Sequence, residues 1–344
     1  GVPPTITTRA WATSSKASVM AAVAPSTPAG GTGSGSRQIP IVCPGHTRPL
    51  AELQFCAVND KDESRTFLVS ACHDKMPMVR DGVTGDWIGT FAGHKGAVWC
   101  CRLDPSGYIA ATASGDFSVK VWDAITGKEL YAFPHKHIVK ALDFSPDSRR
   151  LATGGHEGLL RVYDIGQPNA EPLAVPQLED KKITITKCNW LDDDVILAAC
   201  SDGGIRFWDV SSKESNLLRT LQVDAEVRDM ELSRLSSGEC LLTVAAGTKV
   251  NFFDLSTYEL VRSHPMPIHF RDEGGASLHP DGKKFVAGGS DLWVRLFDFD
   301  SGKELECHKG HHGPLRCLRF SPDGKTFATG SEDGTIRLWK TDSG

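Results

Sequence analysis

The chain has 344 residues, of which 24% are charged, and a formal net charge of −5. A net negative chain lacks the broad basic field that sequence-independent nucleic-acid binding requires, so we expect contacts with RNA to be weak or indirect. The apolar runs are only as long as β-strands, which predicts no membrane-spanning segment. The ten cysteines contain no C-x-x-C pair, which favours the buried, reduced thiols of a cytosolic or nuclear protein.

Residues 1–36 differ in composition from the rest of the chain. They are rich in Ala, Ser, Thr, Gly and Pro, and they contain Arg9 and Lys16 but no acid. Such a segment cannot bury enough apolar area to offset the entropy of ordering, so we expect it to be disordered. An organellar targeting role is one alternative, because transit peptides are basic and acid-poor. Another is that Met20 is the natural start and residues 1–19 are a gene-model artefact.

From residue 37 onward, one short pattern recurs seven times. A cluster of small residues leads through a tight polar turn into a β-run that ends at or near an aromatic residue followed by an acid. Successive endings lie 42, 41, 45, 45, 44 and 42 residues apart. A period of about 40 to 45 residues with such an ending is typical of four-stranded blades, so we predict an all-β fold with one seven-bladed β-propeller over residues 37–344. The seven endings are Asp81, Asp123, Asp164, Asp209, Asp254, Asp298 and Lys340.

The last repeat has room for only three strands of its own, because few residues follow Trp339. Residues 37–43, RQIPIVC, have a strand-like composition and stand directly before the first repeat. We predict that they form the outer strand of the last blade. This closure removes a sheet edge that would otherwise pair with other chains.

The second and seventh repeats each contain a histidine, a threonine, an aspartate and a tryptophan at matching positions. Their spacing lets Asp accept, His relay and the indole N–H donate within one buried chain of hydrogen bonds. A catalytic triad or a zinc site is the alternative, but a group that recurs at one structural offset favours a structural role. We therefore expect no catalytic residue, no metal and no cofactor. The two sets are His94, Thr112, Asp116, Trp122 and His311, Thr329, Asp333, Trp339.

These repeats resemble the WD-repeat family from about residue 37 to the end of the chain. Within it, several longer strings are similar to the serine-threonine kinase receptor-associated (Unr-interacting) group, especially its plant and algal members. A blade as such does not require segments such as DWIG and HKHI. The strings are CPGHTRPL (43–50), TGDWIGTFAGHKGAVW (84–99), HKHIVKALDFSPDS (135–148), ASLHPDGKKFVAGGSD (276–291) and KGHHGPLRCLRFSPDG (309–324).

This resemblance implies a non-enzymatic scaffold for protein partners. Animal members of the group are associated with the SMN complex that assembles spliceosomal snRNPs, with an RNA-binding translation regulator and with TGF-β receptor signalling. We expect a cytoplasmic, partly nuclear adaptor in ribonucleoprotein assembly or mRNA metabolism, monomeric within a larger complex. The alternative is an adaptor in kinase signalling or for ubiquitin-ligase substrates.

Propeller ligands commonly bind over the narrow face, around the central channel. Stepping back four residues from the buried apolar residue of each inner strand gives one ring of positions there, and the residue before each turn acid gives another. Three cations and a tryptophan on one rim suit an acidic or phosphate-bearing partner. The candidate residues are Trp99, Lys140, Arg228 and Arg316 from the first ring and His73, His156 and Glu332 from the second.

A second candidate surface is the outer edge of the first blade. The segment DWIGTF is expected to be its outer strand, where blade packing does not require large aromatic residues. Trp87 and Phe91 would then form an exposed aromatic edge that binds a partner. The alternative is that both rings pack on the loop at residues 59–65.

Overall fold

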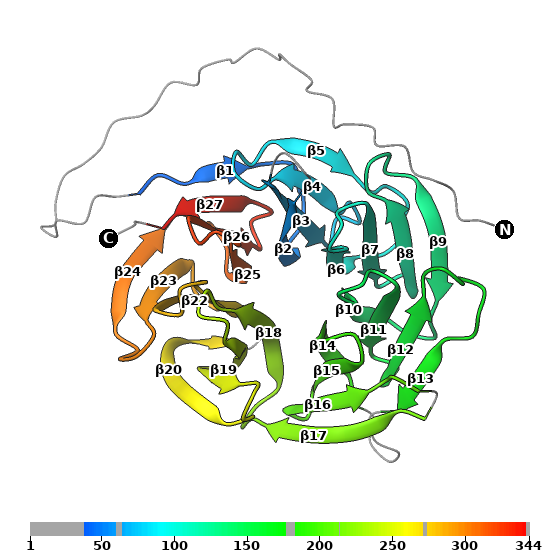
Figure 1. Cartoon of the computed structure of the whole chain (residues 1–344). Helices are drawn as coiled ribbons and strands as arrows, with labels where there is room; N and C mark the ends of the chain where they lie inside the picture. Colours follow the sequence, from blue (N-terminus) through cyan, green and yellow to red (C-terminus); the bar gives the residue numbers. More distant parts are fainter. Residues whose placement is uncertain (1–37, 60–63, 177–182, 213, 271–273, 342–344) are drawn as a thin grey trace, which may run out of the picture. The chain divides into compact units, whose positions relative to one another are not determined.

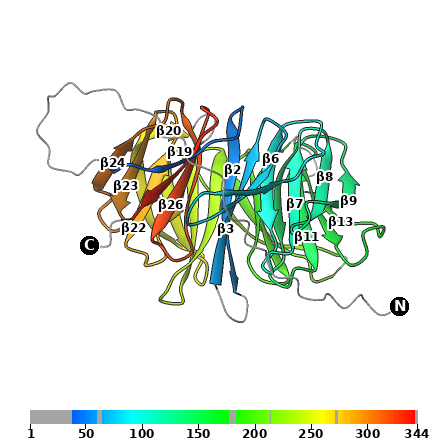
Figure 2. The same ribbon diagram turned by 90° about the horizontal axis from the view of Figure 1, so that it is seen from above.

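The computed structural model describes residues 38–59, 64–176, 183–212, 214–270 and 274–341. These residues form seven antiparallel sheets around a central axis (Figure 1), which confirms the predicted seven-bladed propeller. Figure 2 shows the ring edge-on, with loops at both faces. We call the face at which the inner strands begin the narrow face and the opposite one the wide face.

Blades 1 to 4 each contain four strands, ordered from the channel outward. They are β2 (Leu50–Asn59), β3 (Ser64–Cys72), β4 (Met78–Asp81) and β5 (Trp87–Thr90); β6 (Val98–Leu103), β7 (Ile109–Ser114), β8 (Ser118–Asp123) and β9 (Glu129–Pro134); β10 (Val139–Phe144), β11 (Arg150–Gly155), β12 (Leu159–Asp164) and β13 (Leu173–Pro176); and β14 (Ile185–Trp190), β15 (Val195–Cys200), β16 (Gly204–Asp209) and β17 (Asn216–Gln222).

Blades 5 to 7 complete the ring. Their strands are β18 (Val227–Arg234), β19 (Cys240–Asp254) and β20 (Leu260–Phe270); β21 (Gly275–Leu278), β22 (Lys284–Gly288), β23 (Trp293–Asp298) and β24 (Glu304–Lys309); and β25 (Leu315–Phe320), β26 (Thr326–Ser331), β27 (Ile336–Lys340) and β1 (Ile41–Cys43).

The hydrophobic core lies between neighbouring blades rather than at one centre. For example, Val121 of blade 2 belongs to the same buried cluster as Leu142 and Leu151 of blade 3. Small side chains in the second strands, such as Ala111 and Ala113, are fully buried and allow adjacent sheets to approach closely. Each blade therefore depends on its neighbours for burial of its faces, as the repeat pattern predicts.

The ring closes through the N-terminal strand, as predicted. In β1, Ile41 pairs with Leu338, and Cys43 pairs with Ile336. The Cys43 side chain is buried, and it packs in one cluster with both of these partners and with Leu50 of blade 1. The strand starts at Ile41 and is thus shorter than the predicted segment 37–43.

Blade 5 contains three strands, because the long strand β19 takes the place of the second and third strands of the other blades. Its first half pairs with β18 and its second half with β20. A straight strand of 15 residues would be about 50 Å long, well beyond the 8 residues of β18 and the 11 of β20 on either side of it. The N–H of Leu255 donates to the carbonyl of Cys240 at 3.1 Å, so the strand folds back on itself as a tight hairpin.

All ten cysteines lie among the described residues and form no disulfide; eight are buried. In the described part of the chain, no helix has the length and apolar character that a membrane crossing requires.

Candidate partner-binding surfaces

Blade 2 contains a hydrogen-bonded chain from a buried tryptophan to a turn aspartate. The indole N–H of Trp122 donates to Thr112 Oγ1 at 2.9 Å. His94 Nε2 lies 2.6 Å from the same hydroxyl, and its Nδ1 lies 2.9 Å from Asp116 Oδ2. Burial lowers the pKa of His94, which favours a neutral ring that accepts from Thr112 and donates to Asp116. Asp116 also accepts from the backbone N–H of Lys95, so the chain fixes the loop that enters the inner strand.

Blade 7 repeats this arrangement. Trp339 Nε1 donates to Thr329 Oγ1 at 2.9 Å, and His311 Nε2 lies 2.8 Å from that hydroxyl. His311 Nδ1 lies 3.1 Å from Asp333 Oδ2, which also accepts from the N–H of His312. The two sets therefore join the second strand, the third strand and the narrow-face loop of their blades.

Blade 1 brings together three groups that could serve as metal ligands. The ligand atoms of His46, Cys72 and Asp74 lie within 4.8 Å of one another. However, His46 Nδ1 is already 2.8 Å from the Asp74 carboxylate, and the Cys72 thiol donates to the carbonyl of Arg48. Burial raises the pKa of Cys72 to about 12, so the sulfur is a protonated thiol and not the thiolate that a metal requires. The cluster fits a structural hydrogen-bond network better than a metal site.

Six of the seven predicted first-ring positions meet at the mouth of the channel on the narrow face. They line a small cavity of about 50 Å³, together with Lys187 and Val227. The seventh position, Gly274, lies beside it and donates its N–H to the carbonyl of Arg316. The register of the inner strands thus places these side chains around one opening. The six are Ala51, Trp99, Lys140, Thr186, Arg228 and Arg316.

An aromatic and cationic cluster stands at the centre of this mouth. The Lys140 ammonium lies 4.5 Å from the centroid of the Trp99 ring, which is cation–π geometry. The His73 ring meets the same indole edge-on at 4.4 Å. Burial, then Arg316 and Lys140, lower the pKa of His73, so this imidazole is neutral near pH 7.

The two arginines of the ring are paired within the protein. Arg316 forms an ion pair with Glu332 at 2.5 Å, and Arg228 forms one with Glu226 at 2.8 Å. Both arginines were predicted as binding cations and Glu332 as part of the same surface, but their sequence positions did not predict this pairing. An acidic partner would have to compete with these two glutamates. His156 lies farther out, where it stacks on His137 at 5.1 Å.

The predicted aromatic edge of blade 1 is only half correct. Trp87 starts β5 and is 59% exposed, whereas Phe91 is 2% exposed. The Phe91 ring lies 5.6 Å from that of Trp122 in blade 2, because it covers the buried tryptophan of the neighbouring blade. Phe91 is therefore a packing residue between blades, and the prediction that it forms an exposed edge is wrong.

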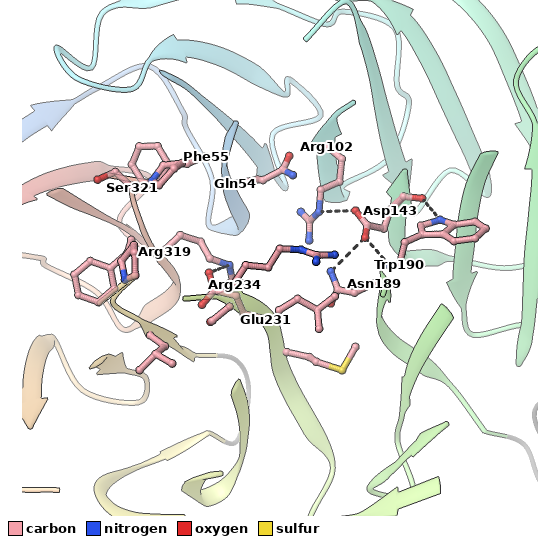
Figure 3. A pocket seen from close by; sticks show the side chains of 17 residues that line it. Gln54, Phe55, Arg102, Asp143, Asn189, Trp190, Glu231, Arg234, Arg319 and Ser321 are labelled. Carbon is pink, nitrogen blue, oxygen red and sulfur yellow. Dashed lines mark hydrogen bonds and ion pairs between the residues drawn. The ribbon is translucent and has the colours of Figure 1, made fainter. Parts of the chain in front are cut away.

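Sequence reasoning missed a larger hollow of about 410 Å³ at the wide end of the channel (Figure 3). Most of its polar walls come from the residue directly before the aligned apolar residue of each inner strand. The same register that located the narrow-face ring could therefore have located these residues. They are Gln54, Arg102, Asp143, Asn189, Glu231 and Arg319.

Most charged groups of this hollow belong to one buried network, whereas Arg234 is exposed and donates to the carbonyl of Leu191. Arg319 pairs with Asp229 at 2.7 Å, and Lys187 lies 3.9 Å from Asp229 and 3.4 Å from Glu52. Glu52 pairs in turn with Arg102, which lies 3.8 Å from Asp143. The network spans the inner strands of six blades, and its arginines already have carboxylate partners. It fits the joining of the blades better than the capture of a ligand.

Seven sheets of this kind define a WD-repeat propeller, and the model of the WD domain, G-beta repeat, matches residues 85–123, 127–164, 176–209 and 302–340. The chain is 44% identical over 284 residues to serine-threonine kinase receptor-associated protein of Dictyostelium discoideum, covering 82% of this chain and 92% of that relative. It is 45% identical to the Gallus gallus protein of the same name over 83% of this chain and 77% of the relative. The chain therefore belongs to the family of serine-threonine kinase receptor-associated proteins. Eukaryotic translation initiation factor 3 subunit I of Drosophila erecta is more distant, at 27% identity.

Proposed function

We propose that the protein is a non-catalytic adaptor that binds protein partners on its narrow face and acts in ribonucleoprotein assembly or mRNA metabolism. The observation that carries the binding site is the cluster of Trp99, Lys140, Arg228 and Arg316 around one opening. Aromatic and arginine side chains at the centre of a surface commonly dominate binding energy.

The hydrogen bonds of the histidine rings support a non-catalytic function. In each complete set both ring nitrogens are already engaged, and the neighbouring threonine hydroxyls are fully buried. A hydrolase needs an exposed nucleophile beside its base. The His-Thr-Asp groups do not offer one.

The choice of process rests on the family and not on the geometry. The name of the relatives associates them with a serine-threonine kinase receptor, which supports kinase signalling as a second candidate. Native co-purification followed by mass spectrometry separates the two. Sm and Gemin-like proteins support ribonucleoprotein assembly, whereas kinases or cullin components support the signalling or ubiquitin-ligase alternative.

The binding surface is tested by reversing its charges. The variant Lys140→Glu, Arg228→Glu, Arg316→Glu should lose the main partner, because like charges across a partly desolvated contact repel. Trp99→Ala should weaken the same partner through the lost aromatic contact. The matched control is Arg149→Glu, Arg262→Glu, Lys325→Glu, since these three cations are in exposed surface ion pairs away from the narrow-face loops.

Retention of every partner by the narrow-face variant would refute this site. If Trp87→Ala lost them instead, binding would belong to the outer edge of blade 1. Circular dichroism and the melting temperature must match the wild type for either result to count.

Location in the cytoplasm and partly in the nucleus is also proposed. A fluorescent fusion of the full chain should distribute between these compartments, and removal of residues 1–36 should leave that distribution unchanged. Organellar fluorescence that disappears on truncation would favour the targeting alternative.

A further inference from the structure

A turn on the narrow face of blade 2 holds a phenylalanine in a left-handed backbone conformation. Phe117 has a φ of 68°, which is unfavourable for a bulky side chain. Glycine occupies the same turn position in blades 3, 4 and 7, with φ of 74°, 79° and 77° at Gly158, Gly203 and Gly334. Lys75 occupies it in blade 1 with φ of 74°, so Phe117 is the one aromatic residue among these five turns. The Phe117 side chain is 44% exposed, so its burial does not offset the strain. A strained, exposed aromatic residue points to a contact outside the fold.

Phe117 stands at one end of a row of three rings, tilted against His137, which in turn stacks on His156. It lies 5.5 Å from the ring of His137, which lies 5.1 Å from that of His156. The carbonyl of Phe117 also accepts from the N–H of His135 at 2.8 Å, so the turn is fixed against blade 3. We call Phe117, His137 and His156 the rim stack.

The loops around the rim stack are positively charged. Lys95 and Lys136 are exposed, and within the described residues the structure places no acid in an ion pair with either side chain. The acids of the same loops are occupied elsewhere, because Asp116 holds His94 and Glu157 pairs with Arg161. The surface therefore combines an exposed ring with an excess of cations.

The rim stack lies close to the cluster at the channel mouth. Lys140, which lies over Trp99, is three residues after His137, and three residues of chain span at most about 11 Å. A ligand that packs on Phe117 and faces Lys140 would therefore carry its ring and its negative charge within a few residues of each other.

We propose that the rim stack and the Trp99–Lys140 pair bind an extended peptide that carries an aromatic side chain within a few positions of an acidic or phosphorylated residue. The peptide ring packs on Phe117, and its anion faces Lys140. This inference rests on the proposed narrow-face function and adds the sequence class of the partner. A peptide fits better than single-stranded nucleic acid, because the chain has a net charge of −5 and both arginines of the mouth are paired with glutamates.

The test is selection of random peptides displayed on phage against wild type and Phe117→Gly. Wild type should enrich peptides with an aromatic residue within a few positions of an acid, and the variant should lose the aromatic preference while keeping the acidic one. For the selected peptides, Phe117→Gly should raise the dissociation constant about three- to tenfold. Replacing the peptide's aromatic residue by serine should abolish that difference.

Loss of the fold is not a concern for this variant, because glycine adopts φ near 68° without strain. Its melting temperature should equal or exceed that of wild type. Ser148→Gly is the matched control: it relieves a left-handed φ of 61° in the wide-face turn between β10 and β11, and should leave peptide binding unchanged.

Identical peptide sets from wild type and Phe117→Gly would overturn the inference while leaving the narrow-face function intact. Retention of the same peptides by the triple charge-reversal variant would instead refute the narrow-face function itself. A single-stranded oligouridylate that binds more tightly than the selected peptides and displaces them would assign the surface to nucleic acid and also overturn the inference.

Discussion

At the residue scale, the hydrogen-bonded sets of His, Thr, Asp and Trp stabilise blades 2 and 7, because their polar groups are costly to leave unpaired. In blade 7, Asp333 accepts from His311 and from the backbone of His312 and Thr335. Burial alone would raise its pKa, but these hydrogen bonds lower it to about 2. The aspartate therefore stays ionised and keeps its acceptors available across the physiological range.

Asp333→Ala should destabilise the protein by about 1 to 3 kcal/mol, because it leaves buried donors without a partner. Asp300→Ala is the control, since that carboxylate is 80% exposed in a surface ion pair, and it should change stability by less than about 1 kcal/mol. Chemical denaturation measures both. If Asp333→Ala left the free energy of unfolding unchanged, the chain of hydrogen bonds would contribute nothing to stability.

His135 makes stability depend on pH. Burial, reinforced by Arg161, lowers its pKa to about 4, whereas an unfolded histidine titrates near 6.5. The unfolded chain thus binds the proton more readily between these values, so stability is complete above about pH 6.5 and falls as the pH drops toward 4. His135→Asn should flatten this slope in a melting-temperature series, and the exposed His137→Asn should not. Equal slopes for both variants would contradict the assignment.

At the element scale, the closing strand is short but carries a buried side chain. Deleting residues 37–43 removes the Cys43 side chain from its cluster with Ile336 and Leu338 and uncovers the edge of β27. We expect a markedly lower melting temperature and self-association through that edge, both visible by scanning calorimetry and light scattering. Deleting residues 1–36 is the control and should change neither. Equal effects of the two deletions would refute closure by β1.

The elements were predictable where local composition repeats, and less so where packing decides. The period located all seven blades and the closing strand, because turn residues and β-branched runs recur along one chain. It predicted a turn in the fifth repeat, but not that one continuous strand, β19, would run through this turn and pair with β18 before it and β20 after it. It also wrongly predicted an exposed Phe91, because the sequence shows that this residue is apolar but not that it packs on the Trp122 ring of the next blade.

At the scale of the whole molecule, the ring is held by charges that no single repeat reveals. Arg319 of blade 7 and Asp229 of blade 5 are 90 residues apart in sequence, yet they form two hydrogen bonds of 2.7 Å. A Cβ at Gly275 would lie 2.2 Å from that carboxylate, so glycine in the intervening blade leaves room for the pair. Such pairing depends on closure of the ring, which explains why the pattern of a single repeat does not predict the Arg319–Asp229 pair.

Asp229→Ala should therefore destabilise the protein by about 3 to 5 kcal/mol, because it leaves the buried Arg319 charge without its main partner. Asp224→Ala removes the partner of Lys249 in an exposed pair and should cost about 1 kcal/mol or less. Equilibrium unfolding of both variants measures the difference. Similar losses would mean that the channel network does not hold the blades together.

The central claim is that partners bind at the narrow face, and a hydrogen-exchange footprint of the native complex tests it most directly. The complex is purified through this chain, and its exchange is compared with that of the isolated propeller. We predict slower exchange in the loops at residues 94–97, 115–117 and 135–138 and at the start of β25, with no change in β5. Protection confined to β5 around Trp87, or to the wide-face turns, would contradict the account.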